Sequence, residues 1–157
     1  MYQFLNLKEI IMKKTLIALA LTLVAAASMA AEVNVDAVRD YHSGSNGARV
    51  LLSAGSVYGV TPLVSATRVN NQYTRYAAGA KLDLASVGPV TLSGVATTVY
   101  QDSVTGRSGY GLTAGLSANV ALSKNIDLVA SVERFAGQQR VSSRNGAVVA
   151  VGLNVKF

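Results

Sequence analysis

An alternation of apolar and polar residues, repeated along most of the chain, is the feature that most restricts its fold. In "YGLTAGLSANVAL", residues 110–122, every second residue from Tyr110 to Leu122 is apolar. Successive side chains of a β-strand point to opposite faces, so a period of two predicts strands with one apolar face. After residue 31 no apolar run approaches the roughly 20 residues that a membrane-spanning helix needs. The pattern therefore predicts an all-β protein.

Turn residues divide the alternation into eight segments. They are Glu32–His42, Ala48–Tyr58, Leu63–Asn70, Tyr73–Leu84, Val90–Gln101, Tyr110–Leu122, Ile126–Phe135 and Ala147–Phe157. The third is the least regular, and the fifth is expected to change phase near Gly94, as at a β-bulge. Alternating segments of about ten residues, in an even number, are typical of bacterial transmembrane β-barrels. We therefore predict an eight-stranded antiparallel up-and-down transmembrane β-barrel, with a soluble secreted β-sandwich as the alternative.

The connections and the aromatic residues support the barrel. Connections after the second, fourth and sixth segments are short, whereas those after the first, fifth and seventh are longer and polar. With both ends of the barrel in the periplasm, the short connections are periplasmic turns and the longer ones face outside. Aromatic residues lie near segment ends, as the girdles of membrane barrels require. Near the outer ends are Tyr41, Tyr73, Tyr76, Tyr100, Tyr110 and Phe135, and near the inner ends are Tyr58 and Phe157.

The first 30 residues are typical of an export signal. Lys13 and Lys14 precede an apolar run at residues 16–27, and the small-residue pattern "SMA" follows at residues 28–30. The run is too short for a membrane anchor, which needs roughly 20 residues. We expect residues 1–11 to be an upstream extension before Met12, residues 12–30 to be the signal peptide and residues 31–157 to be the barrel.

The composition excludes several classes of function. Charged residues make up 14% of the chain, below the roughly 25% of soluble domains. The absence of Cys excludes disulfides and thiolate metal sites. Residues 31–157 carry 11 basic and seven acidic side chains, and their net charge of +4 is too small to indicate nucleic-acid binding. The sequence has no phosphate-binding, dinucleotide-binding, zinc or calcium motif, so we expect no cofactor and no metal.

The last segment resembles the C-terminal signature of Gram-negative outer-membrane proteins. Its apolar phase is Val151, Leu153, Val155 and Phe157. In those families this strand is read by the barrel-assembly machinery. The length and the eight segments are similar to small barrels of the OmpX type and to the OmpA transmembrane domain. The resemblance implies a monomeric protein of the bacterial outer membrane, with a structural or surface-interaction role among outer-membrane lipids.

The polar phase of the segments is predicted to fill the lumen. Its five acidic and five basic residues are Asp36, Asp40, Arg49, Arg68, Arg75, Lys81, Asp83, Asp127, Glu133 and Lys156. An eight-stranded barrel is only wide enough for side chains to fill it, and buried charges must be paired. We therefore expect a packed polar plug rather than an open pore, with a narrow channel for small solutes as an alternative.

The predicted outer rim is basic. Its arginines are Arg39, Arg107, Arg134, Arg140 and Arg144, against a single acidic residue, Asp102. Arginine pairs strongly, and often through two hydrogen bonds, with phosphate. The lipopolysaccharide of the outer leaflet carries phosphates, so we expect these arginines to contact it.

A lipid-modifying enzyme is a further alternative. His42 lies beside Ser43 and Ser45 in a predicted outer loop, and Glu133 is a candidate carboxylate. A His, a Ser and a carboxylate together can make a hydrolase. "HSGSN" is loosely similar to the pattern of outer-membrane lipid A deacylases, but its position and the spacing of His and Ser differ. We expect no catalytic residues.

Overall fold

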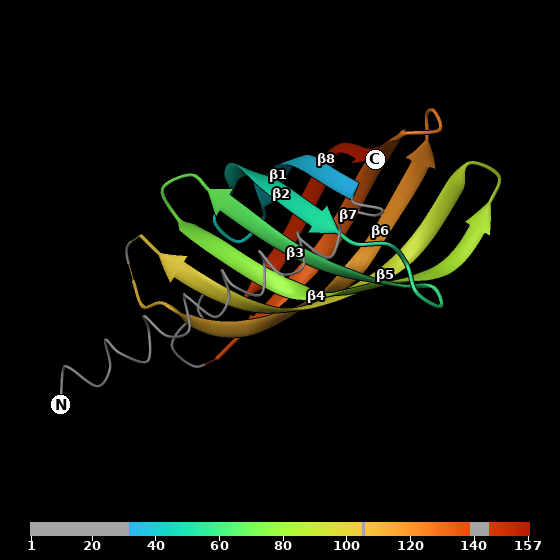
Figure 1. Ribbon diagram of the computed structural model, residues 1–157. Helices are drawn as coiled ribbons and strands as arrows, with labels where there is room; N and C mark the ends of the chain where they lie inside the picture. Colours follow the sequence, from blue (N-terminus) through green and yellow to red (C-terminus); the bar gives the residue numbers. More distant parts are fainter. Residues whose placement is uncertain (1–31, 105, 139–144) are drawn as a thin grey trace.

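The computed structural model describes residues 32–104, 106–138 and 145–157, and these form a closed antiparallel β-barrel (Figure 1). Its strands are β1 (Glu32–Asp40), β2 (Ser45–Ser53), β3 (Val60–Val69), β4 (Tyr73–Val87), β5 (Val90–Ser103), β6 (Gly109–Ala121), β7 (Ile126–Gly137) and β8 (Gly146–Lys156). Each strand pairs with the next along the chain, and β8 pairs with β1 to close the sheet. The prediction of an eight-stranded up-and-down barrel is confirmed, and the sandwich alternative is wrong.

The two ends of the barrel are distinguished by their connections. The hairpins β1–β2, β3–β4, β5–β6 and β7–β8 lie at what we call the outer end. The other three hairpins lie at the inner end, together with the start of β1 and the end of β8. The predicted upstream extension (1–11) and signal peptide (12–30) lie outside the described residues. Within the described ranges, no helix is long and apolar enough to cross a membrane.

The boundary between the second and third strands differs from the prediction. β2 ends at Ser53 rather than at Tyr58, and β3 begins at Val60 rather than at Leu63. A tight turn centred on Tyr58 and Gly59, with φ angles of 53° and 79°, reverses the chain before β3. Tyr58 is fully exposed at this turn instead of standing on the barrel wall.

The alternation of β3 is the reverse of the predicted one. Leu63 and Val69 are 3% and 1% exposed and point into the barrel, whereas Arg68 is exposed on its outside. The physical reason is that the outer part of the lumen is apolar, because Val38 and Tyr73 from other strands pack there with Val69. The prediction of Arg68 as a lumen residue is therefore wrong.

The strands β4 and β5 are the longest, with 15 and 14 residues, and reach past the inner end of β3 (Figure 1). The expected irregularity is present at the level of Gly94 but lies in the partner strand, between Asp83 and Ala85 of β4. Leu84 is the additional residue, and its insertion places Ala85 opposite Leu92 on the outward side. The hairpin therefore stays apolar on its outer face up to its turn.

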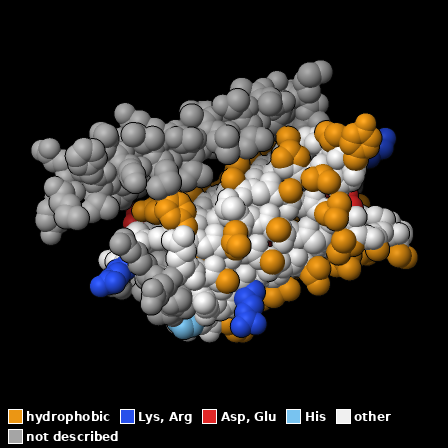
Figure 2. All heavy atoms as spheres, turned by 90° about the horizontal axis from the view of Figure 1, so that it is seen from below, with side chains coloured by type: hydrophobic (Ala, Val, Ile, Leu, Met, Phe, Trp, Pro, Cys, Tyr) orange, Lys and Arg blue, Asp and Glu red, His pale blue; other side chains and the backbone are white. Residues whose placement is uncertain are grey.

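The outward phase of the barrel is apolar. Val35 and Val151 are 55% and 49% exposed on the outer surface. Figure 2 shows hydrophobic side chains spread across one face of the molecule, with Lys and Arg side chains near its edges. Tyr76, Tyr100 and Tyr110 stand in register on β4, β5 and β6, and the ring centroids of the last two lie 5.1 Å apart. An apolar wall with a row of aromatic residues is typical of a barrel that faces lipid.

Candidate functional site

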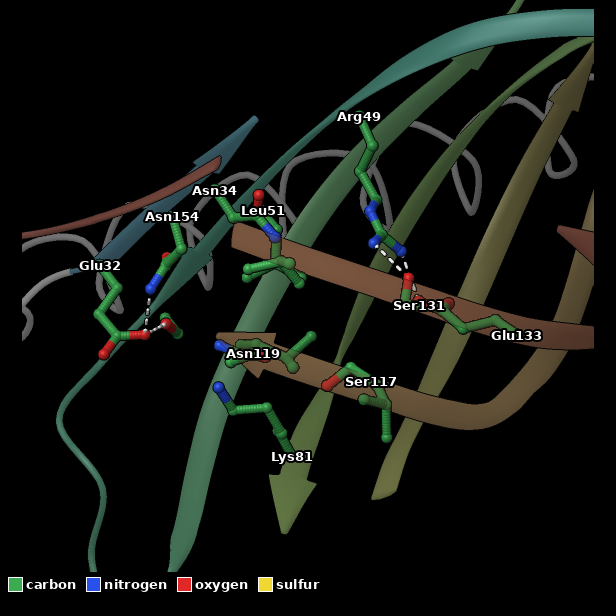
Figure 3. A pocket seen from close by; sticks show the side chains of 14 residues that line it. Glu32, Asn34, Arg49, Leu51, Lys81, Ser117, Asn119, Ser131, Glu133 and Asn154 are labelled. Atoms are coloured by element: carbon green, nitrogen blue, oxygen red, sulfur yellow. Dashed lines mark hydrogen bonds and ion pairs between the residues drawn. The ribbon is translucent and has the colours of Figure 1, made fainter. Parts of the chain in front are cut away.

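Arg49 is the centre of an ion cluster in the middle of the lumen. Its Nη2 atom lies 2.6 Å from Oδ2 of Asp36, which stands directly opposite on β1. The same guanidinium reaches across the lumen to β7, where it pairs with Glu133 and donates a hydrogen bond of 2.9 Å to Ser131 Oγ (Figure 3). A buried guanidinium between two carboxylates uses most of its donors, and this pairing is what makes the buried charges tolerable.

The wall beside Asp36 requires a residue without a side chain. Gly152 on β8 stands opposite Asp36 in the register that closes the barrel. A methyl group at this position would collide with the carbonyl oxygen of Val35 and with Oδ1 of Asp36. Glycine here lets β1 and β8 approach closely while the carboxylate stays beside Arg49.

Paired polar side chains lie in the inner half of the lumen, beside the buried side chains of Leu63, Val95 and Val129. Lys156 Nζ lies 2.7 Å from Asp127 Oδ2, next to the end of β8. Glu32 accepts hydrogen bonds from Asn154 Nδ2 at 3.2 Å and from Ser53 Oγ at 3.4 Å, as the dashed lines of Figure 3 mark for this pair of contacts. These contacts tie β1, β2, β7 and β8 together at the inner end.

A small cavity opens among these polar residues. It has about 30 Å³ of space for the centres of water molecules, and Lys81, Ser117 and Asn119 are among the residues that line it. That space holds only one or two waters. Asp83, closer to the inner end, accepts a hydrogen bond of 2.7 Å from Ser93 Oγ.

The outer half of the lumen is closed by aromatic and aliphatic side chains. The Arg75 guanidinium carbon lies 4.0 Å from the ring centroid of Tyr73 and 4.0 Å from that of Phe135, so the cation is held between two rings. Its Nε atom donates a hydrogen bond of 2.8 Å to Gln101 Oε1. Cation–π contacts of a desolvated guanidinium are worth about 2 kcal/mol each. We call Tyr73, Arg75, Gln101 and Phe135 the outer plug.

The outer plug corrects two expectations. Tyr73 and Phe135 are 0% and 1% exposed inside the barrel, so they do not belong to an external aromatic girdle. The lumen is also not filled by polar groups alone, because Val38, Val99 and Ala150 are buried in its outer half. Alternation places Phe135 in the same phase as Glu133, and this was the signal in the sequence that pointed to its inward position.

The ion cluster lies between two cavities. A second cavity, also with about 30 Å³ of space for water centres, is lined by residues of the outer plug, and both cavities are lined by Arg49 and Glu133. In the described part of the chain, the paired side chains of Arg49 and Glu133 therefore stand between two water-sized spaces.

The structure places most of the predicted lumen residues on the inward phase of their strands. Those facing inward are Asp36, Asp40, Arg49, Arg75, Lys81, Asp83, Asp127, Glu133 and Lys156. Only some of them meet: Asp36, Arg49 and Glu133 form one cluster, and Asp127 and Lys156 form a separate pair. Sequence reasoning missed Glu32, which the polar phase of the first segment already indicated.

The predicted rim arginines are spread around the outer end. Arg39 and Arg134 are exposed on the outward phase of β1 and β7, and Arg107 is exposed in the connection between β5 and β6. Arg39 Nη1 donates a hydrogen bond of 2.8 Å to Asn46 Oδ1 on β2. Arg140 and Arg144 lie outside the described residues.

The residues of the hydrolase alternative do not form a catalytic arrangement in the part of the chain that is described. His42 is exposed in the β1–β2 connection, where its backbone N–H donates to Asp40 Oδ1 at 2.8 Å. Glu133 is turned into the lumen and paired with Arg49. Ser43 Oγ accepts from the backbone N–H of Ser45 at 3.3 Å, which is a local turn contact. Among the described residues no group of three His, Cys, Asp or Glu side chains can hold a metal ion.

Comparison with known proteins gives a likeness of fold. No protein-family model matches the chain, and no curated protein matches its sequence. The N-terminal β-barrel domain of OprF from Pseudomonas aeruginosa is similar in structure, with a TM-score of 0.63 at 11% identity, over 82% of this chain and 97% of that one. The outer-membrane protein Ail from Yersinia pestis gives 0.57 at 13% identity, over 82% and 99%. Neisserial surface protein A gives 0.52 at 17% identity, over 82% and 95%. At these identities the likeness concerns the fold alone, which is that of the small eight-stranded outer-membrane β-barrels.

Proposed function

We propose that this protein is an integral barrel of the bacterial outer membrane, with a structural or surface-interaction role and a basic outer rim that contacts lipopolysaccharide. The observation that carries the proposal is the distribution of side chains, which is the reverse of that in a soluble protein. The outer wall is apolar, whereas the paired charges of Asp36, Arg49 and Glu133 are inside. Lipid on the outside and packed polar side chains on the inside satisfy both surfaces.

The dimensions of the strands support this location. The strands have between nine and 15 residues, and a tilted transmembrane strand needs about nine to 11. Every strand among the described residues has a hydrogen-bonded neighbour on each side, as a lipid environment demands of backbone groups.

The filled lumen favours a structural or surface role over transport. The outer plug and the Arg49 cluster occupy successive levels of the barrel, and the two cavities beside them are water-sized. A solute would have to displace paired buried charges, which is costly. The surfaces left for interaction are therefore the outer wall and the outer rim.

The rim is suited to anionic lipid headgroups. Arg39 and Arg134 stand on the lipid-facing phase at the outer end, where phosphates of an outer leaflet lie, and Arg107 stands in an outer connection. A cation at this depth costs little and gains from anions close to it.

The outward phase of β8 supports a role in assembly. Val151, Leu153 and Val155 are 49%, 49% and 36% exposed on one side of β8, and Phe157, one residue past the end of the strand, is 79% exposed. An apolar ridge of this kind is available to the barrel-assembly machinery before the strand reaches lipid. We propose that these four residues are the assembly signal.

The test is migration of the detergent-extracted membrane fraction on gels with and without boiling, for the full chain and for a variant lacking Phe157. A compact band that shifts on boiling, found in the outer membrane and lost in the variant, is the expected result. A soluble protein without a shift would overturn the membrane location. A normal band from the variant would overturn only the assembly signal.

Lipopolysaccharide contact is tested separately with protein refolded in detergent. Replacing Arg39, Arg107 and Arg134 together by Gln should weaken binding to lipopolysaccharide about tenfold or more, because charge-assisted hydrogen bonds are lost. Replacing Lys124, exposed at the inner end, by Gln is the control and should change nothing. Unchanged binding of the triple variant would contradict a role of the rim.

A further inference from the structure

Arg68 has a position that neither the lumen nor the predicted rim explains. It is exposed on the outward phase of β3, close to the outer end of the strand. Two strands away, Arg39 is exposed on the outward phase of β1, also close to the outer end. Between them on β2 stands Asn46, whose Oδ1 accepts the hydrogen bond of 2.8 Å from Arg39 Nη1.

The register brings these three side chains together on one face. Arg39 and Asn46 are direct cross-strand partners. Arg68 is the partner of Ala48, two residues from Asn46, and is therefore its diagonal neighbour on the same face. β1 and β3 are separated by two strand spacings, about 10 Å. Two long arginine side chains on either side of a short asparagine can reach one anion above it.

The two arginines have no acidic partner in the described part of the chain. The ion pairs of the structure involve other cations, Arg49 and Lys156. The carboxylate at the outer end of the outer wall, Asp102, is on β5 and accepts a hydrogen bond of 2.8 Å from Ser108 Oγ. A cation at the interfacial level of the outer wall costs little, and it gains stability from an anion that pairs with it there. The described residues supply no such anion to Arg39 and Arg68, so a phosphate of the surrounding lipid can serve as their counter-charge.

The wall on the membrane side of these residues is suited to acyl chains. Two positions further along each strand, in the same phase, stand Ala37 on β1, Ala48 on β2 and Ala66 on β3, all exposed. Methyl side chains let a hydrocarbon chain lie close to the strands. The opposite arc is different, since β4, β5 and β6 carry the tyrosine row instead.

We propose that Arg39, Asn46 and Arg68 form a specific site for a phosphate of lipid A, with its acyl chains along the alanines below. The proposal rests on the proposed function, because it deepens lipopolysaccharide contact from a general basic rim to one face of the barrel. The guanidinium forks hold the phosphate, the Asn46 amide holds Arg39 in place, and the alanine face receives the hydrocarbon.

The experiment compares two double variants of equal charge, both refolded in detergent and verified by the heat-dependent band shift. Binding of bisphosphorylated lipid A is measured by native mass spectrometry. Arg39→Gln with Arg68→Gln should weaken binding about tenfold or more, since two charge-assisted contacts are lost. Arg107→Gln with Arg134→Gln should weaken it less than about threefold, as expected for general screening of exposed charges.

Further variants and ligands keep the proposal open to refutation. Arg39→Lys with Arg68→Lys preserves the charge but loses the two-pronged hydrogen bonds, so it should bind with intermediate affinity. Lipid A stripped of phosphate should bind the wild type as weakly as bisphosphorylated lipid A binds the Gln variant. The assignment to lipid A would be overturned if phosphatidylglycerol bound as tightly as bisphosphorylated lipid A. It would also be overturned if inorganic phosphate competed for the site as well as lipid A does.

The outcomes separate this site from the proposed function. Equal losses in the two double variants would mean that charge alone matters, which overturns the site and leaves the basic rim in place. A loss confined to Arg107→Gln with Arg134→Gln would do the same. Failure of the wild type to bind lipopolysaccharide would overturn both.

Discussion

Arg49 is the side chain on which the lumen depends most, because it satisfies two buried carboxylates at once. Replacing it by Met keeps the volume and leaves Asp36 and Glu133 without their partner. Removing one member of a buried ion cluster costs roughly 3–5 kcal/mol. We expect the free energy of unfolding in urea, measured in lipid vesicles, to fall by this order. Arg134→Met, on the outer wall, is the control, and an equal loss there would contradict the argument.

Gly152 is expected to be indispensable for another reason, the close approach of β1 and β8. In Gly152→Ala the new methyl group meets the Val35 carbonyl oxygen and Asp36 Oδ1, so the barrel should not close. Gly94→Ala is the matched control, because its methyl group would meet only Leu84, at 3.7 Å, an ordinary contact. The fraction of compact, heat-shifted protein after refolding measures both. Normal closure of the Gly152 variant would contradict this reading.

At the residue scale, alternation predicted which side chains share a face but not always which face is inside. Arg75 and Arg68 were both assigned to the lumen, and only Arg75 is there. The assumption that apolar means outside fails at the outer half, where Val69 and Phe135 are packed inward. In β3 the inward-facing residues toward the two ends of the strand, Leu63 and Val69, are apolar, so the sequence of β3 alone does not indicate which of its faces is inside. The side chains of the neighbouring strands determine which face points into the lumen.

Among the elements, the β4–β5 hairpin shows how one inserted residue, Leu84, keeps the outer face of the hairpin apolar. Deleting Leu84 would leave Asp83 opposite Ser93 and bring Ala85 into the next position of the ladder, where it already pairs with Leu92. We therefore expect the deletion variant to refold to a normal compact band. Deleting Ala80 instead shifts the register in mid-strand, which reverses every side chain on one side of the deletion and should abolish folding. Similar yields from the two deletions would contradict the assignment of the bulge.

The boundary between β2 and β3 shows that the position of a turn could not be predicted from the sequence alone. Residues 59–62, "GVTP", separate the second and third predicted segments because Gly and Pro favour a turn, yet Pro62 lies inside β3. The Pro62 carbonyl oxygen accepts a hydrogen bond of 3.1 Å from the backbone N–H of Ala54, just beyond the end of β2. Proline is tolerated at this position because pairing with β2 no longer needs a backbone N–H from residue 62. The turn forms earlier, at Tyr58 and Gly59. Propensity identified a reversal of the chain here, and pairing with neighbouring strands decided its position.

For the whole molecule, the side chains that fill successive levels of the lumen predict that the barrel does not conduct ions. The wild type should give no stable conductance in planar lipid bilayers, because the outer plug and the Arg49 cluster close successive levels. Replacing Tyr73, Phe135 and Arg49 together by Ala removes the side chains that close both levels and should increase the conductance measurably. Leu112→Ala, on the outer wall, should leave it at the wild-type level. Steady channels in the wild type would favour the solute-channel alternative.

Closure of the sheet has a consequence for the order of events in folding. Seven of the pairings between described strands join neighbours in the chain, but β8 pairs with β1, as in Glu32 opposite Lys156. The local hairpins can form early, whereas the last pairing must bring the two ends of the sequence together and is slow by its contact order. Until then the sheet carries two free edges that match each other in register. The same complementarity allows the first strand of one molecule to pair with the last strand of another, so these two edges are the part of the unclosed sheet that most needs protection before closure.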